Sequence, residues 1–439
     1  MKKRISRNLI FLICGLLAIG LIITGTMCYQ SENRTTIRIG IFTGSPWNVP
    51  DVYTYEFIED AIGKFEEAHP GIKVEYISGI MREDYSEWLA GKVVEGTAPD
   101  VFMILPEDFS VLQKSGSLLE LDSLIAGDDE FNPDDFYDGA YNYGSIGGSQ
   151  YALPLECAPD MMFVNKTLLK QYGIDTPDVD WTWDDFYNIC KKVTCDTDEN
   201  GVIDQFGVYN YSLEQAFMTN DVKPFDEEGR NCNLQGENAE QAVEFLQRIN
   251  SLSGGAVVTA GDFNLGKVAF MPLTLAEYRT YKPYPWSIKR YSSFDWDCIT
   301  LPKGPQGDNI SKMNTLLLGI NSRSKKKQLA WELMKTFCYD EEIQSEIYKY
   351  RAGGSPLKNI LGDEQILLNE NQELPKDSSI NVSIINTIME SSSEDYNFNN
   401  INQSKEMLRQ GIEDILKDEK NPEIALKQLQ REINQYLSR

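Results

Sequence analysis

The chain has 439 residues, of which 41% are hydrophobic and 11% aromatic, and its 67 acidic and 41 basic residues give a net charge of −26. This composition indicates a globular protein whose length exceeds what one core usually supports, so we expect two domains. The acidic surface argues against nucleic acid and anionic lipid headgroups as partners and favours an uncharged ligand.

The N-terminus has the order of an export signal, in which a basic flank precedes an apolar segment and a polar stretch. The run from Leu9 to Met27 is just long enough to span a bilayer. Cys28 stands where a lipid-modified cysteine would be, although the preceding residues fit that motif poorly. We therefore expect residues 1–36 to be a signal, anchor and linker. A lipid on Cys28 or an uncleaved N-terminal helix would hold the folded part at the extracellular face of the membrane.

Strands and helices alternate in the first part of the chain. A strand at residues 37–42 ends in a loop that exposes Trp47, and Asp100 opens a later strand. The apolar spacing predicts the following order: a strand at 37–42, a helix at 55–68, a strand at 72–77, a helix at 85–96 and a strand at 101–105. This is a β-α-β pattern, which implies parallel strands in an α/β lobe.

The stretch from Gly147 to Lys166 places an acid between apolar runs. YALPL and MMFV are each typical of a short strand, and Glu156 lies between them. A carboxylate there is costly to bury without a partner, so Glu156 is expected at an edge, a hinge or a cleft. The alternative is a turn acid that faces water.

The second part of the chain is richer in helices. Thr182 is a plausible N-cap, which makes Trp183 a core anchor at a helix start. The spacing also predicts a helix at 238–252 and two C-terminal helices separated by Asn421-Pro422.

Neither the cysteines nor the acidic loop predicts a firm metal site. The six cysteines after Cys28 form no CxxC pair, and the only histidine is His69, so buried apolar cysteines are expected and zinc is not. Four residues of one loop have calcium-loop spacing: Asp196, Asp198, Asn200 and Asp204. The bidentate Glu required at position 12 is replaced by Gly207, which favours a hydrated turn. No cofactor is expected.

Several motifs in order resemble one family. They include FEEAHPGIKVEYI, GTAPDVFMI, YALPLE with FVNKTLL, LGKVAFM, ITLPKGPQG, LLLGINSRSKKKQLAWELMKTF and RAGGSP. Together they resemble the extracellular solute-binding proteins of sugar-transporting ABC importers, the family that includes maltose-binding protein. Two departures are Val164, where the family usually has Tyr, and LTLAEY, which lacks the common Gly-x-Trp.

The resemblance implies an α/β, two-lobed periplasmic-binding-protein type II fold with a ligand cleft between the lobes. The first lobe would comprise residues 37–152 and 318–372, and the second 153–317 and 373–439. The implied partners are a carbohydrate ligand and the transmembrane subunits of an ABC permease, with the chain itself a monomer.

Sugar binding calls for aromatic rings that stack on a pyranose and for charged groups that bind its hydroxyls. Each candidate also has a structural alternative: a core position for Trp47, a turn cap for Asp100 and a surface ion pair for Arg351. Of Tyr209 and Tyr211, one is expected to face the cleft and the other to pack. The candidate ligand-binding residues are Trp47, Asp100, Glu156, Tyr209, Tyr278, Trp286 and Arg351. The resemblance makes Glu156 the strongest acid, and Glu156→Gln is expected to weaken sugar binding without lowering the melting temperature.

The function implied is the substrate-binding component of a carbohydrate importer that captures a sugar, in particular an oligosaccharide, and is not an enzyme. A binding protein that presents its ligand state to a membrane receptor kinase is the alternative from another class. The chain has no GxSxG motif, whereas paired carboxylates leave a cleft glycoside hydrolase open.

Overall fold

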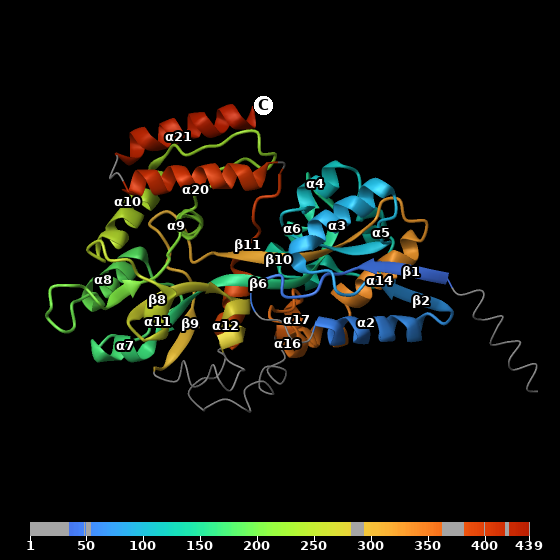
Figure 1. Cartoon of the computed structure of the whole chain (residues 1–439), viewed down its shortest axis with the longest axis horizontal. Helices are drawn as coiled ribbons and strands as arrows, with labels where there is room; N and C mark the ends of the chain where they lie inside the picture. Colours follow the sequence, from blue (N-terminus) through green and yellow to red (C-terminus); the bar gives the residue numbers. More distant parts are fainter. Residues whose placement is uncertain are drawn as a thin grey trace, which may run out of the picture.

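The computed structural model describes residues 35–47, 49, 54–281, 294–361, 382–398, 400–417 and 421–438. They form two lobes joined by long strands, and the first lobe lies on the right in Figure 1. Its elements are β1 (Thr35–Gly40), α2 (Thr54–Ala68), β2 (Ile72–Tyr76), α3 (Arg82–Glu95), β3 (Val101–Ile104), α4 (Phe109–Lys114), α5 (Asp122–Ala126), η1 (Pro133–Asp135), α6 (Asp138–Tyr143), β4 (Ser145–Ile146), β5 (Ser149–Gln150), α14 (Lys327–Cys338), α15 (Glu341–Ser345), α16 (Ile347–Tyr350) and α17 (Lys358–Leu361).

The second lobe lies on the left of Figure 1. Its elements are α7 (Lys166–Gln171), α8 (Trp183–Val193), β7 (Phe206–Val208), α9 (Leu213–Thr219), α10 (Glu237–Ser251), α11 (Ala260–Asn264), β8 (Val268–Thr274), α12 (Leu275–Tyr281), β9 (Trp296–Ile299), α20 (Ile401–Lys417) and α21 (Pro422–Leu437). The connecting elements are β6 (Ala152–Asn165), β10 (Ser311–Ile320), α19 (Val382–Glu390) and β11 (Ser392–Ser393).

One nine-stranded sheet runs through both lobes. Its order is β2-β1-β3-β10-β6-β8-β7, with β11 beside β10 and β9 beside β6. β1 pairs in parallel with β2 and β3, which confirms the β-α-β arrangement predicted for the first part of the chain. β6 and β10 are antiparallel and form the middle of the sheet, so the lobes share a backbone hydrogen-bond network.

The stretch predicted as two short strands is one strand, β6, and all of its residues are buried. Its first half pairs with β10 and its second half with β8 and β9, so β6 passes from one lobe into the other. Pro154 and Pro159 lack a backbone N–H and cannot donate to a strand ladder. The pairing continues past Pro154 because the register shifts between Leu316, opposite Glu156, and Leu317, opposite Pro154.

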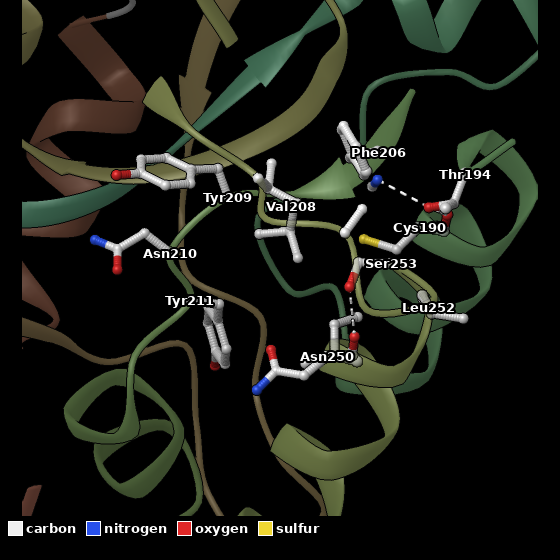
Figure 2. Close-up of a pocket in the computed structure, with 14 residues that line it drawn as sticks. Cys190, Thr194, Phe206, Val208, Tyr209, Asn210, Tyr211, Asn250, Leu252 and Ser253 are labelled. Carbon is white, nitrogen blue, oxygen red and sulfur yellow. Dashed lines mark hydrogen bonds between the residues drawn. The ribbon is translucent and has the colours of Figure 1, made fainter. Parts of the chain in front are cut away.

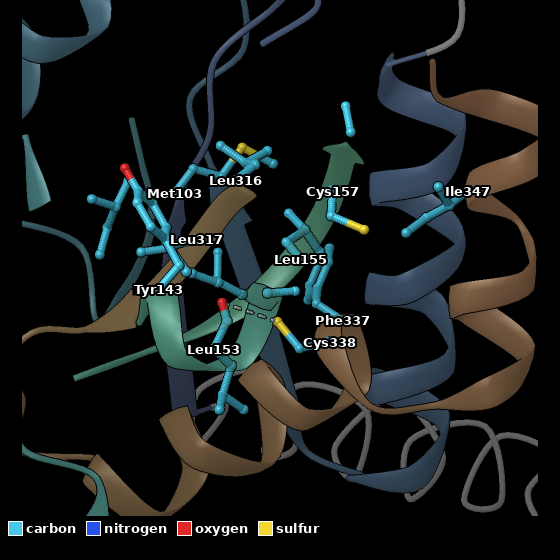
Figure 3. Close-up of a cluster of buried hydrophobic side chains, with 14 of the residues drawn as sticks. Met103, Tyr143, Leu153, Leu155, Cys157, Leu316, Leu317, Phe337, Cys338 and Ile347 are labelled. Atoms are coloured by element: carbon cyan, nitrogen blue, oxygen red, sulfur yellow. Dashed lines mark hydrogen bonds between the residues drawn. The ribbon is translucent and has the colours of Figure 1, made fainter. Parts of the chain in front are cut away.

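Two hydrophobic clusters stabilise the molecule. The first fills the first lobe, where Leu155 of β6 lies near Phe337 of α14 and Leu317 of β10 lies near Tyr143 of α6, as Figure 3 shows, and it continues onto β8 and β9. The second lies among α8, α10, α20 and α21. Within it Trp183 stacks on Phe245 at 4.3 Å between ring centroids. Its helix begins with the predicted N-cap, Thr182, in a capping box.

The predicted lobe boundaries at 152/153 and 317/318 fall in or beside the two central strands, and the boundary at 372/373 lies outside the described residues. α19, which the prediction assigned to the second lobe, buries Ile385, Ile388 and Met389 in the first cluster. α20 packs in the second cluster. The chain therefore changes cluster along β11, because the apolar face of α19 is buried against the first.

The six cysteines of the described part are free thiols, and all except the half-buried Cys195 are buried, as predicted. None of the described helices is long and apolar enough to cross a membrane. Cys28 and the expected anchor lie outside the described residues.

A cluster of charges joins the second lobe to the central strands. Lys312 of β10 lies 2.9 Å from Glu214 of α9, and Lys405 of α20 lies 3.7 Å from the same carboxylate and also pairs with Asp395. Desolvation alone would raise the pKa of Glu214, but Lys312 and Lys405 lower it to about 2. Burial raises the pKa of Asp160, which accepts a hydrogen bond from Asn314 at 2.9 Å.

Replacement of Glu214 by Gln should remove a stabilisation that depends on pH. Because the pKa is lowered from 4.5 to about 2, the carboxylate stabilises the fold above pH 4.5, and this contribution is lost as the pH falls towards 2. Half of the Glu214 side chain is exposed, so screening by solvent keeps the effect small. Urea unfolding at pH 7, 4.5 and 3 should show a difference from wild type that shrinks with acid.

The exposed Glu244 of α10 provides the matched control, Glu244→Gln. Asp160 titrates with the opposite sign, but burial is the largest cause of its raised pKa and Glu214 the smallest, so most of this contribution cancels in the difference. A Glu214→Gln difference that grows as the pH falls would contradict this account of the charge cluster.

Candidate functional site

Three of the predicted site residues meet where β6 passes between the lobes. Trp47 lies in the loop after β1, Glu156 lies on β6, and Arg351 directly follows α16. Trp47 Nε1 donates to Glu156 Oε1 at 2.7 Å, and Arg351 Nε and Nη2 each lie 2.8 Å from Glu156 Oε2. Glu156 is 1% exposed and Arg351 5%, so this ion pair is buried.

A glycine-rich turn completes this group. Gly353 donates its backbone N–H to Glu156 Oε1 at 2.6 Å, and a Cβ at Gly353 would lie 2.5 Å from that oxygen. Gly354 and Cys157 exchange backbone hydrogen bonds of 2.9 and 2.7 Å, which fix the turn against β6. Only glycine allows the backbone to approach the carboxylate this closely.

The Glu156 carboxylate therefore accepts three hydrogen bonds from the protein itself, and Arg351 Nη2 lies at ion-pair distance from Oε2. It lies at the junction of the lobes, and three groups of the protein itself bind its two oxygens. Its contacts orient two other predicted site residues, Trp47 and Arg351. Trp47 is half-buried, with its indole N–H held by Glu156.

Other predicted site residues lie elsewhere. Tyr278 is 1% exposed and meets Trp296 edge to face, so its ring presents no face to a ligand. Asp100 stands at the amino end of β3, where it accepts hydrogen bonds from Arg38 N and from Ser324 Oγ at 2.6 Å. These contacts make Asp100 a local structural cap, the alternative that the sequence left open. Trp286 lies outside the described residues.

A cavity of about 410 Å³ lies beside β7 in the second lobe. Tyr209 is half-buried at its rim, whereas Tyr211 is buried and its hydroxyl lies 3.2 Å from Trp183 Nε1 and from Thr219 Oγ1. In Figure 2 the side chains of Tyr209 and Asn210 lie on one side, and those of Thr194 and Leu252 on the other. No charged residue lines the cavity: its walls are Cys190, Thr194, Phe206, Gly207, Val208, Tyr209, Asn210, Tyr211, Ile249, Asn250, Leu252, Ser253, Ala256 and Val258.

The loop with calcium-like spacing uses its acids on its own backbone. Asp196 accepts the N–H groups of Asn200 and Gly201, the latter at 2.6 Å. Asp204 accepts the N–H of Thr197 and pairs with Lys267 at 3.3 Å. Across the described ranges, no group of three or more His, Cys, Asp or Glu side chains is placed to hold a metal ion. These hydrogen bonds close the loop into a local turn on its own backbone.

Sequence reasoning missed Arg279 of α12, which reaches the same glycine-rich turn. Its guanidinium donates to the backbone carbonyls of Tyr348, Arg351 and Gly353. The paired glycines of RAGGSP indicated a turn at this place. No local signal could connect it to an arginine some 70 residues away.

Comparison with known families matches residues 49–344 to the model of bacterial extracellular solute-binding proteins. A curated relative, an uncharacterized lipoprotein from the oleD 5′ region of Streptomyces antibioticus, is 26% identical over 138 residues. That alignment spans 31% of this chain and only 30% of the relative.

Solved structures share the fold over nearly the whole chain. The sugar-binding protein MalE of Xanthomonas citri has a TM-score of 0.75 at 16% identity, covering 92% of this chain and 98% of its own. The cyclic alpha-maltosyl-1,6-maltose binding protein of Arthrobacter globiformis has 0.75 at 14% identity, with coverages of 92% and 99%. An ABC substrate-binding protein of Listeria monocytogenes, in complex with cycloalternan, has 0.68 at 20% identity, with coverages of 92% and 99%. The predicted two-lobed α/β fold is thereby confirmed.

Glu156→Gln should now destabilise the unliganded protein, contrary to the expectation from sequence. The change leaves the buried guanidinium of Arg351 without its counter-charge, and breaking a buried pair in this way costs about 3–5 kcal/mol. Urea unfolding should show this loss, whereas Glu227→Gln in an exposed turn should show almost none.

The double variant Glu156→Gln with Arg351→Met should recover part of the loss, because no unpaired charge then remains buried. An unchanged unfolding midpoint in Glu156→Gln would mean that the ion pair contributes nothing to the fold.

Proposed function

This chain belongs to the family of bacterial extracellular solute-binding proteins, and on that premise we propose that it is the substrate-binding component of a carbohydrate ABC importer. Its ligand is a sugar, in particular an oligosaccharide, which it binds between the lobes and delivers to the permease. A lipid on Cys28 or an uncleaved N-terminal helix tethers the chain, as a monomer, at the extracellular face of the membrane.

The observation that carries this proposal is the convergence of Trp47, Glu156 and Arg351 at the crossing between the lobes. A half-buried indole whose N–H is fixed keeps one ring orientation, and an oriented ring is what a pyranose face needs for stacking. We assign Trp47 as the stacking platform. Glu156 and Arg351 are the residues that hold it in place.

The charge distribution favours a neutral ligand. The chain carries a net charge of −26, and the cavity beside β7 is lined by hydroxyl, amide and apolar groups alone. Such walls suit hydroxyl groups better than an anion. Tyr209 at the cavity rim adds a second aromatic ring, 162 positions along the chain from Trp47.

The mechanism that we propose is a population shift between open and closed lobes. β6 and β10 pass between the lobes as a paired ribbon, and the register shift at Leu316 and Leu317 interrupts its regular ladder. Rotation about this ribbon would bring the lobes together on a ligand. The permease would recognise the closed form. Three solved structures with this fold are described as sugar-binding proteins or as a complex with a sugar, which supports a sugar as the class of ligand.

Trp47→Ala should weaken binding of the sugar that stacks on it by at least about tenfold, because the apolar ring face is lost. A thermal-shift screen with maltotriose, mannotriose and xylotriose would select the sugar, and titration calorimetry would give the affinities. Trp47→Phe should retain part of the binding, because it keeps a ring but loses the hydrogen bond to Glu156.

Trp88→Ala is the matched control, since Trp88 is also half-buried in the first lobe but stacks on Tyr85. An affinity unchanged in Trp47→Ala would remove Trp47 from the site. Absence of compaction in small-angle X-ray scattering with any sugar that raises the melting temperature would overturn the proposed mechanism.

A further inference from the structure

Arg279 lies on a helix whose start is firmly fixed. α12 follows β8 directly, and Thr274 at the end of β8 exchanges hydrogen bonds with Glu277: Thr274 N donates to Glu277 Oε2 at 2.7 Å, and Glu277 N donates to Thr274 Oγ1 at 3.2 Å. Thr274 is itself paired with Asp160 of β6. The position of Arg279 is therefore set by the sheet of the second lobe.

The Arg279 guanidinium binds the end of α16 and the turn that follows it. Nη1 donates to the carbonyl of Arg351 at 2.9 Å and to that of Gly353, and Nη2 donates to the carbonyl of Tyr348 at 2.5 Å. The guanidinium carbon also lies 5.1 Å from the centroid of the Tyr348 ring. The last carbonyls of a helix have no partner within the helix, so a cation with a planar fork suits this place.

The two partners belong to different lobes. α12 packs on β6 and β8, whereas α16 packs on α2 of the first lobe. Leu275 at the start of α12 also lies close to the turn, since a Cβ on Gly354 would be 3.0 Å from its Cδ2. Arg279 of the second lobe thus donates hydrogen bonds to a turn that follows α16 of the first lobe.

The same turn is bound from its other side by Glu156, through Arg351 and the N–H of Gly353. Glu156 therefore binds the donors of the turn, while Arg279 binds its carbonyl acceptors. A change in the angle between the lobes that moves α12 away from α16 breaks the second set of contacts and leaves the first intact.

We propose that Arg279 is a positioning residue that clamps the lobes together and sets the balance between the closed and the open arrangement of the unliganded chain. A ligand that needs the closed form binds with an apparent affinity reduced by the fraction of closed molecules. Loss of the clamp lowers that fraction. Arg279 thereby tunes ligand affinity and release without touching the ligand.

The test uses Arg279→Gln and Arg279→Lys in the unliganded full chain, with Arg431→Gln on the exposed face of α21 as the control. Small-angle X-ray scattering should show a larger radius of gyration for Arg279→Gln, an intermediate value for Arg279→Lys and the wild-type value for Arg431→Gln. Lys retains the charge but lacks the fork, so partial rescue is expected. Unfolding by urea, followed in parallel, reports whether each variant is folded.

A radius of gyration that is unchanged in folded Arg279→Gln would overturn the proposal. So would a lowered unfolding midpoint in both variants without any expansion, because that is the result for a purely structural residue. If Arg279→Gln does not fold, the outcome rests on the expansion of Arg279→Lys alone.

The scattering experiment does not depend on the proposed function, because it needs no ligand. Where a sugar has been identified, Arg279→Gln should also raise its apparent dissociation constant about threefold or more, as expected from a smaller closed fraction. A chain that binds no sugar but expands in Arg279→Gln would contradict the proposed function and leave the clamp standing. A chain that binds a sugar but does not expand in Arg279→Gln would contradict the clamp alone.

Discussion

The buried ion pair between Glu156 and Arg351 is the constraint around which the junction of the lobes is built. Removing both charges from water is costly, and the cost is offset only when every acceptor is satisfied. Three hydrogen bonds to the Glu156 carboxylate, together with the charge of Arg351, offset that cost. They come from the loop after β1 and from the turn after α16, so the ion pair fixes segments that are distant in sequence.

The central strands explain why a charge is tolerated at this depth. β6 is buried along its whole length and belongs to both lobes. A movement of either lobe therefore also shifts the strands that pair with β6. The two acidic groups on β6 are Glu156, where it pairs with β10, and Asp160, where it pairs with β8. Each is satisfied by side chains from other elements, Arg351 in one case and Asn314 in the other.

A two-lobed binding protein must be rigid within each lobe and adjustable between them. The two hydrophobic clusters supply rigidity, and the first extends from the first lobe onto β8 and α12 of the second. The contacts of Glu156 and Arg279 with the turn after α16 are polar and directional. Hydrogen bonds of this kind are exchanged readily for bonds to water, whereas buried apolar surface is not. The angle between the lobes is thus governed by a few named groups, and Trp47 is oriented by the same groups.

The sequence by itself determined the features that depend on neighbouring residues. The alternation of strands and helices, the N-cap at Thr182, the anchor Trp183 and the break at Asn421-Pro422 all follow from local periodicity and capping, and the order of motifs identified the family. Only the tertiary structure decided that β6 is continuous, that Tyr278 is buried and that Asp100 binds Arg38 N and Ser324 Oγ. It also decided which donors bind Glu156, because its partners lie 109 to 197 residues away and no local pattern encodes which donors a buried carboxylate will meet.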